Sequence, residues 1–434
     1  MIAGMLKQFR RDGVDRSPTG MYALGTRLAG ATAIFFGGIL TLALLDPERI
    51  GVFLSVTALS AFAAVGDLGL TYSLLLAASS RPPEKAGSVA WAALAAAIPT
   101  APITSAVLFL GGSALLLEGN VAVDRWLWPW MAFCAMSGIQ LVLTLALTYV
   151  EGTGRRHAAW RANFWIEIAC GIVFVGLIAL RQELWAIAAA AAVRSVLIAL
   201  LLVFRFKLPD RAGAGSRFAL WREELWPMQW KSLVNSVAGL LTTRLLTPIL
   251  LAVQGAAAAG QIGLVLVLAY LMTATASVLP LSQTALYASL YHQGKRGELK
   301  QAFRHTFAVG TALAMLFFVG VAAACGLIRE HSPYMAARLP ETQVIWLVLA
   351  ITPISHVSNF FAIAIRSQRK DPGVIPNLLL TLPSLVIIWL AARNGALAFS
   401  ATYLATTTAV AVLYGYLFWR FIRGMRPTHR APDG

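Results

Sequence analysis

Six ionisable side chains lie inside long apolar segments of this 434-residue sequence, away from the segment ends, and are the main candidates for chemistry. They are three arginines, two acids and a histidine: Arg27, Arg194, Arg244, Asp67, Glu167 and His356. A charge at bilayer depth costs at least about 2.5–3.5 kcal/mol on insertion scales, so it usually faces a cavity or a partner. The arginines outnumber the acids by one, and a guanidinium binds phosphate through paired N–H donors. Arg194 and Arg244 are therefore the best candidate phosphate ligands, with snorkelling or bonding to helix carbonyls as the alternative for each.

Two pairs of opposite charges could meet between neighbouring segments. Arg27 and Asp67 lie near the inner thirds of the first two apolar segments, and adjacent antiparallel helices could bring them together. Such an ion pair either locks the hairpin or faces a cavity, where it breaks and re-forms as the helices move. Glu167 and Arg194 pose the same question in the fifth and sixth segments, because a long guanidinium could reach that carboxylate.

Uncharged polar groups in the apolar segments have two interpretations each. His356 lies between Pro353 and Asn359 and could carry protons near neutral pH, or it could form hydrogen bonds beside a proline kink. Three amide side chains could contact the hydroxyl groups of a ligand or hold helices together: Gln140, Asn235 and Gln283.

Motifs for enzymatic chemistry are missing from the sequence. There is no G-x-x-x-x-G-K-[ST] phosphate loop, so direct use of ATP is not expected. The acids of the short external turns are scattered, with no partner at catalytic spacing, and the three cysteines fall inside apolar segments. We therefore expect a protein that is not an enzyme and that holds neither a metal nor another cofactor.

Helices that cross a membrane must position these side chains. Apolar residues make up 58 % of the sequence, charged residues 12 %, and the mean hydropathy is +0.71. Twelve apolar runs are each about as long as a membrane-spanning helix, at 20–45, 50–78, 87–117, 127–150, 162–181, 184–204, 227–252, 259–290, 302–328, 342–365, 373–392 and 396–421. The predicted fold is an all-α polytopic membrane protein with about 12 transmembrane helices.

The basic residues predict the orientation. Of 35 lysines and arginines, 26 fall on one set of connections and six on the other, with three inside apolar runs. Such a bias places both termini in the cytoplasm. The net charge of +16 is spread over short loops on one membrane face, which suits anionic headgroups and argues against nucleic acid as a partner.

The longest connection, 205–226, divides the chain into two halves. We expect two six-helix bundles, 1–208 and 209–434, around a central cavity, which is a common plan for transporters. A weak internal echo supports a duplication: GVFL at 51–54 recurs as GLVL at 263–266, each shortly after an external turn.

Short motifs resemble one family. LDPERIGVF at 45–53 is followed by GDLGL at 66–70, similar to the first hairpin of polysaccharide-type lipid flippases. The second half agrees, with LWPMQW at 225–230, TRL at 243–245 and AGQIGL at 259–264. These stretches resemble the polysaccharide/O-antigen flippases of the multidrug/oligosaccharidyl-lipid/polysaccharide exporter (MOP) superfamily. One departure is Thr242-Thr243, where relatives often place an acid before the arginine.

The resemblance implies a substrate and partners. It implies a flippase of the bacterial inner membrane that moves an undecaprenyl-linked oligosaccharide to the outer leaflet for lipopolysaccharide or other surface polysaccharide, with membrane lipids and other glycan-assembly proteins as partners. Substrate contacts would then come from Arg27, Asp67, Arg194, Arg244, His356, Gln140, Asn235 and Gln283. The alternatives are a cation-coupled small-molecule exporter of the same superfamily, a membrane glycan polymerase or transferase, and an inactive scaffold. The enzyme class would normally gather acids or histidines on an enlarged loop, and the sequence has no such loop.

Overall fold

The protein is described by a computed structural model that covers residues 18–79, 83–206, 217–283, 287, 290–291, 294–366 and 374–424. All regular secondary structure in these ranges is helical. Ten helices are long and apolar enough to cross a membrane, and a bent pair brings the number to eleven. A shorter apolar helix, Leu28–Leu44, adds a further candidate near the N-terminus. The predicted all-α polytopic class is confirmed, as expected where lipid leaves no solvent partner for backbone N–H and C=O groups.

The chain forms two compact units, Met1–Gly260 and Gln261–Gly434, and it passes from one to the other inside helix α12 (Ala256–Ser282). Part of the predicted linker, residues 207–216, lies outside the described residues. The division into bundles at 208/209 stays a prediction.

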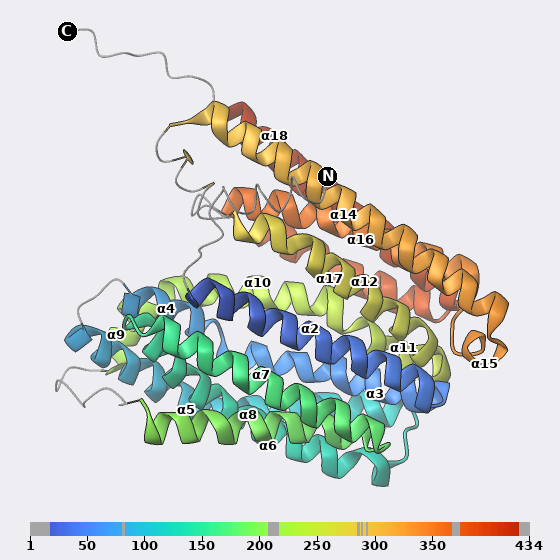
Figure 1. The fold of residues 1–434 in the computed structure, drawn as a ribbon, viewed down its shortest axis with the longest axis horizontal. Coiled ribbons are helices and arrows are strands. Elements are labelled where there is room, and N and C mark those ends of the chain that lie inside the picture. The colour runs from blue at the N-terminus through green and yellow to red at the C-terminus, as the bar shows by residue number, and fades with distance from the viewer. Residues whose placement is uncertain are drawn as a thin grey trace. The chain divides into compact units, whose positions relative to one another are not determined.

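The first unit is built on long helices that pack side by side (Figure 1). Helix α7 (Arg156–Ala179) packs along α2 (Pro18–Leu44) and along α8 (Glu183–Phe204). Helix α6 (Val123–Gly152) packs against α8 and α5 (Pro83–Glu118). The remaining elements are α3 (Pro47–Ser60), η1 (Ala61–Asp67), α4 (Leu70–Ser79), α9 (Arg217–Leu220), η2 (Trp221–Leu225), α10 (Trp226–Arg244) and α11 (Leu246–Gln254).

The second unit is organised around α16 (Thr342–Arg366), which packs along α14 (Arg296–His331) and α18 (Ala396–Gly424). Stacked and edge-to-face rings join these three helices, from Phe303 and Phe307 on α14 to Phe360, Phe361 and Phe418. Helix α17 (Val374–Ala392) packs on α18, and the short α15 (Pro333–Ala336) follows α14.

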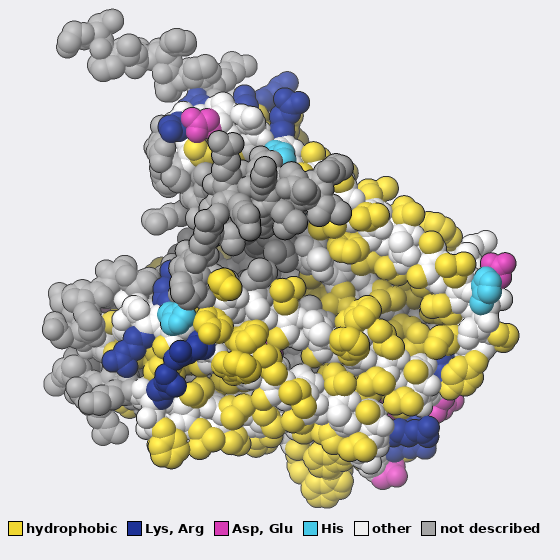
Figure 2. Space-filling model, viewed as in Figure 1, with side chains coloured by type: hydrophobic (Ala, Val, Ile, Leu, Met, Phe, Trp, Pro, Cys, Tyr) yellow, Lys and Arg dark blue, Asp and Glu magenta, His cyan; other side chains and the backbone are white. Residues whose placement is uncertain are grey.

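Large apolar side chains cover the outside of the helices, as Figure 2 shows for one face. Val203 and Phe204 expose 76 % and 81 % of their surfaces, and Ile103, Val107 and Leu110 of α5 are exposed in the same way. Soluble proteins rarely expose apolar patches of this extent, so this surface matches the acyl chains of a bilayer.

The LDPERIGVF motif builds the start of α3. Asp46 caps the helix, accepting a hydrogen bond from the backbone N–H of Arg49 at 2.8 Å, and Pro47 occupies the first turn, where its missing N–H costs nothing. Gly51 then faces the first turn of α12. A Cβ atom at Gly51 would lie 1.8 Å from the carbonyl oxygen of Ala256.

This close contact is reciprocal. A Cβ atom at Gly260 would lie 2.1 Å from the carbonyl oxygen of Pro47 and 2.9 Å from the amide nitrogen of Gly51. The pairs Pro47/Ala256 and Gly51/Gly260 are both 209 positions apart, so corresponding turns of the two halves contact each other in the same way. The echo of GVFL at 51–54 in GLVL at 263–266 has an offset of 212 positions rather than 209, so the duplication stays a prediction.

We predict that Gly51→Ala and Gly260→Ala each destabilise the protein by about 1–3 kcal/mol, because the added methyl group meets backbone rather than a movable side chain. Thermal unfolding of the purified protein in detergent measures the effect. Gly111→Ala on α5 is the matched control, since nothing lies within 4 Å of its Cβ position. An unchanged melting temperature for Gly51→Ala would show that the two helices are not in backbone contact.

Candidate functional site

The second predicted span is broken at the Asp67-Leu68-Gly69 motif. The 3₁₀ helix η1 ends at Asp67, and Leu68 and Gly69 adopt left-handed φ angles of 50° and 78° before α4 begins. The Asp67 carboxylate accepts a hydrogen bond from the backbone N–H of Gly69, and Ser73 donates its hydroxyl to the Gly69 carbonyl at 2.9 Å. Element η1 packs against α5, α6 and α10. Broken helices of this kind are where membrane transporters bind substrates and ions.

The expected pair between Arg27 and Asp67 stays a prediction. The Arg27 side chain lies outside the described residues, and the helix that carries it, α2, packs chiefly along α7. In the structure the Asp67 carboxylate holds the turn at the helix break, because it accepts a hydrogen bond from the backbone N–H of Gly69.

Arg244 lies at a second break. It is the last residue of α10, and the segments Ser236–Arg244 and Leu246–Gln254 meet at an angle of 40°. Pro248 has no N–H to donate to the Arg244 carbonyl four residues earlier, which accounts for the bend. The Arg244 side chain is half-buried at this bend.

The predicted contact between Glu167 and Arg194 is confirmed. The Arg194 guanidinium donates to the Glu167 carboxylate between α7 and α8, and the two side chains are 25 % and 23 % exposed. Beside them, the Cys170 thiol donates to the carbonyl of Ala190 at 3.4 Å. Arg194 is therefore neutralised by the protein itself, so binding of a phosphate there would have to compete with Glu167.

A polar depression of about 770 Å³ opens at the end of the first unit where α3 and α8 begin. Its organising contact is a two-point ion pair, with Arg49 Nε 2.8 Å from Glu183 Oε1 and Nη2 2.9 Å from Oε2. Arg49 also donates to the carbonyl of Arg181 at 3.2 Å. The lining further includes Asp46, Glu48 and Arg125. Planar pairing of this kind fixes the orientation of both side chains.

His356 is fully buried on α16, in a notch that Gly310 of α14 leaves open. A Cβ atom at Gly310 would lie 2.6 Å from His356 Cε1 and 2.7 Å from Nε2. Neither ring nitrogen has a hydrogen-bond partner among the described residues. Ser277 on α12 and Thr311 on α14 also bury hydroxyl groups without partners in this part of the chain. Buried polar groups without partners among the described residues are costly, and these gather in the core of the second unit.

The three amides are placed less distinctively. Gln140 is half-buried on α6. Gln283 lies in the turn after α12, where its backbone N–H donates to the Pro280 carbonyl at 3.3 Å. The Asn235 side chain lies outside the described residues, and its position is on α10. The role of these three residues in substrate binding remains a prediction.

Several structural partners were missed by the sequence interpretation. Arg49 and Glu183 are 134 positions apart and were assigned to separate external turns. No sequence motif marks Gly310, Ser277 or Thr311. A search for small residues that leave space for a buried histidine could have found Gly310. Among the described residues, no group of three or more His, Cys, Asp or Glu side chains could hold a metal ion.

The Glu167–Arg194 pair can be tested with a double-mutant cycle. We expect Glu167→Gln and Arg194→Gln each to lower the melting temperature in detergent, because each leaves a partly buried charge without its partner. The double variant should recover part of the loss, with a coupling of about 0.5–3 kcal/mol. The control is the exposed pair Lys295–Glu298, at 3.7 Å, whose cycle should give a coupling of about 0–1 kcal/mol. Equal couplings for the two pairs would contradict the structural role of Glu167–Arg194.

His356→Leu should leave the free energy of unfolding unchanged or raise it, because an apolar side chain of similar volume replaces two ring nitrogens that lack partners among the described residues. Gly310→Ala should lower it, since the new methyl group meets the imidazole ring. Both are measured by thermal unfolding in detergent. A loss of more than about 2 kcal/mol in His356→Leu would mean that the ring is hydrogen-bonded after all.

Comparisons with known proteins show which solved structures have a similar fold. No protein-family profile matches the sequence, and no curated protein is similar to it. A solved structure of a multidrug resistance MATE family transporter of the MOP superfamily, in its inward-facing conformation, is similar over 94 % of this chain and 100 % of its own, with a TM-score of 0.65 and 15 % identity. The outward-facing conformation of such a transporter gives a TM-score of 0.54, 13 % identity and coverage of 94 % and 97 %.

A MOP superfamily transporter from Pyrococcus furiosus, described as having a binding pocket of reverse polarity, is also similar. The TM-score is 0.57 with 15 % identity, over 95 % of this chain and 97 % of that one. The protein therefore has the fold of MOP superfamily transporters along nearly its whole length.

Proposed function

We propose that this protein is a membrane exporter of the MOP type that moves small molecules and is coupled to a cation gradient. The observation that carries the proposal is the similarity of fold, over 94 % of the chain, to structures described as multidrug resistance transporters. The two helix breaks, at Asp67 and at Arg244, support it, because interrupted helices in transporters form ion and substrate sites.

Asp67 is the coupling acid in this proposal. In the described spans, Glu167 is the one acid away from a helix end, and it is paired with Arg194. Asp67 lies instead at the break, with its carboxylate held by a backbone N–H. A carboxylate at this position can bind a proton or a sodium ion without first releasing an arginine of the described set.

A second candidate is the flippase for a lipid-linked oligosaccharide. Two observations favour it: the motifs that resemble the flippases build the cap, the glycine contact and the break of the second span, and arginines outnumber acids inside the spans. In that case Arg244 would bind the lipid phosphate, with Gln140, Asn235 and Gln283 facing the sugars. Both candidates place the protein in the bacterial inner membrane with cytoplasmic termini, as the distribution of basic residues suggests.

Transport assays in proteoliposomes separate the two candidates. We expect export of a cationic dye such as ethidium when a sodium or proton gradient is imposed, and loss of export when an ionophore dissipates it. Asp67→Asn should reduce export to background with folded protein present, because the amide keeps the size but cannot take up a cation. Asp124→Asn, in an exposed first turn of α6, is the matched control and should leave export unchanged.

The opposite pattern would favour the flippase. Dye export at background, together with translocation of a fluorescent polyprenyl-pyrophosphate sugar that Arg244→Ala abolishes, would overturn the exporter proposal. Gradient-dependent dye export that survives Asp67→Asn would keep the exporter function and remove Asp67 from it.

A further inference from the structure

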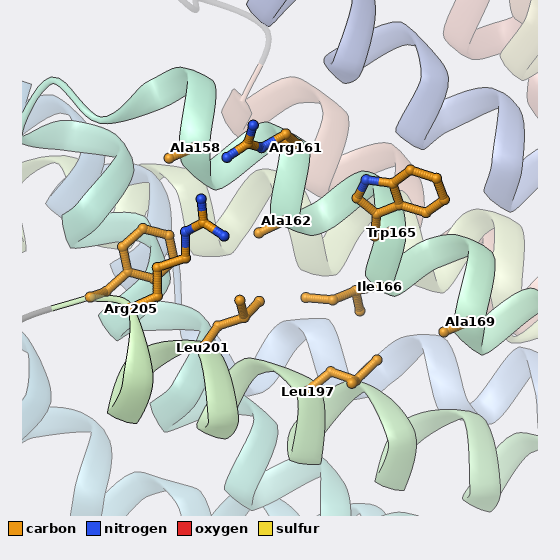
Figure 3. A pocket seen from close by; sticks show the side chains of 10 residues that line it. Ala158, Arg161, Ala162, Trp165, Ile166, Ala169, Leu197, Leu201 and Arg205 are labelled. Carbon is orange, nitrogen blue, oxygen red and sulfur yellow. The ribbon is translucent and has the colours of Figure 1, made fainter.

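A groove of about 340 Å³ lies on the first unit between the start of α7 and the end of α8. Figure 3 shows two arginine side chains at this groove, Arg161 from α7 and Arg205 from the end of α8, with apolar side chains below them. The groove is separate from the Glu167–Arg194 pair, because neither member of that pair lines it.

The two guanidinium groups share the mouth of the groove without an acid beside them. Neither Arg161 nor Arg205 makes a side-chain hydrogen bond or an ion pair with another described residue, and no acid lines the groove. The nearby Glu151 is already engaged, since its Oε1 accepts from the indole N–H of Trp160 at 3.0 Å. Arg155 and Arg156 add exposed positive charge where α7 begins. Basic side chains gather at that end of the unit in Figure 2.

The rest of the groove is apolar. Ile166 is buried at its floor, Leu197 and Leu201 form the α8 wall, and the Trp165 indole stands 60 % exposed on the α7 side. Leu200, the residue before Leu201 on α8, is also exposed. A tryptophan beside a charged mouth is typical of the depth where acyl chains meet headgroups.

We propose that this groove binds an anionic phospholipid, with its phosphate between Arg161 and Arg205 and an acyl chain along Leu197, Leu201 and Trp165. A phosphate oxygen can accept from each guanidinium, which offsets the repulsion between two neighbouring cations. The apolar floor explains why the ligand is a lipid rather than free phosphate. Both charged residues fall on the connections that the sequence assigns to the cytoplasmic face, where anionic lipids create a negative surface potential.

Native mass spectrometry of the full-length protein in detergent tests the proposal with added phosphatidylglycerol or phosphatidylcholine. We expect phosphatidylglycerol to be retained preferentially, and Arg161→Gln/Arg205→Gln to weaken its binding by about tenfold or more. Arg155→Gln/Arg156→Gln removes the same charge from the same end of α7 but outside the groove, and it should retain most binding. Leu201→Trp, which adds bulk to the apolar α8 wall and keeps both arginines, should also weaken binding.

Three outcomes would overturn the proposal. Equal loss in the two arginine pairs would mean diffuse attraction to a basic surface. Displacement of the phospholipid by millimolar inorganic phosphate, with no effect of Leu201→Trp, would mean a free-phosphate site. Stronger retention of a polyprenyl phosphate than of phosphatidylglycerol would identify the groove with the glycolipid substrate of the flippase candidate. Gel filtration and the melting temperature of each variant confirm that it is folded, and because retention is read without transport, the proposed export function is tested separately.

Discussion

The backbone contact between α3 and α12 constrains the geometry of the first unit. Gly51 and Gly260 each face a carbonyl oxygen of the other helix, at separations that leave no room for a side chain. This crossing orients the start of α3, and therefore Asp46 at the helix cap and Arg49 one turn later. Arg49 in turn holds Glu183 at the start of α8 through two hydrogen bonds. Three helices thus depend on two positions at which only glycine fits, and small residues allow such close approach in membrane proteins generally.

Charges inside the spans are used in two ways. The Glu167–Arg194 pair neutralises itself between α7 and α8, and such a pair contributes to the structure at the expense of two desolvated groups. Asp67 lies at a helix break, bound by a backbone N–H, and Arg244 lies at a bend that Pro248 produces. Residues at breaks can change their partners with small movements of the chain, whereas residues in the middle of packed helices cannot. This contrast is the reason for assigning the coupling role to Asp67 and a structural role to Glu167.

In the second unit the notable polar group is an uncharged ring rather than an ion pair. His356 is fully buried, with two ring nitrogens that lack partners among the described residues, in space created by Gly310. Around it the unit is rich in packed aromatic rings, which stabilise the α14, α16 and α18 contacts without hydrogen bonds. The lipid-facing surface is likewise apolar, since acyl chains surround exposed apolar side chains at no cost, whereas an exposed polar side chain loses its hydrogen bonds to water. The groove at Arg161 and Arg205 departs from this pattern, and an anionic headgroup would supply the missing polar partner.

The all-α membrane class and the approximate positions of the spans follow from the sequence alone. Length and hydropathy suffice for this, because a bilayer admits helices whose backbone groups are all satisfied internally. The sequence also anticipated the Glu167–Arg194 contact, because the two segments are consecutive and a guanidinium is long. The partners of Arg49, the notch around His356 and the contact at Gly51 became apparent from the packing of the helices. Those contacts depend on how each helix is rotated about its axis, and helices that are apolar on nearly every side carry little sequence signal for that rotation. The two helix breaks are intermediate in predictability. Pro248 and Gly69 indicate in the sequence where the helices break. At the first break, the packing of α5, α6 and α10 around η1 then determines the surroundings of Asp67.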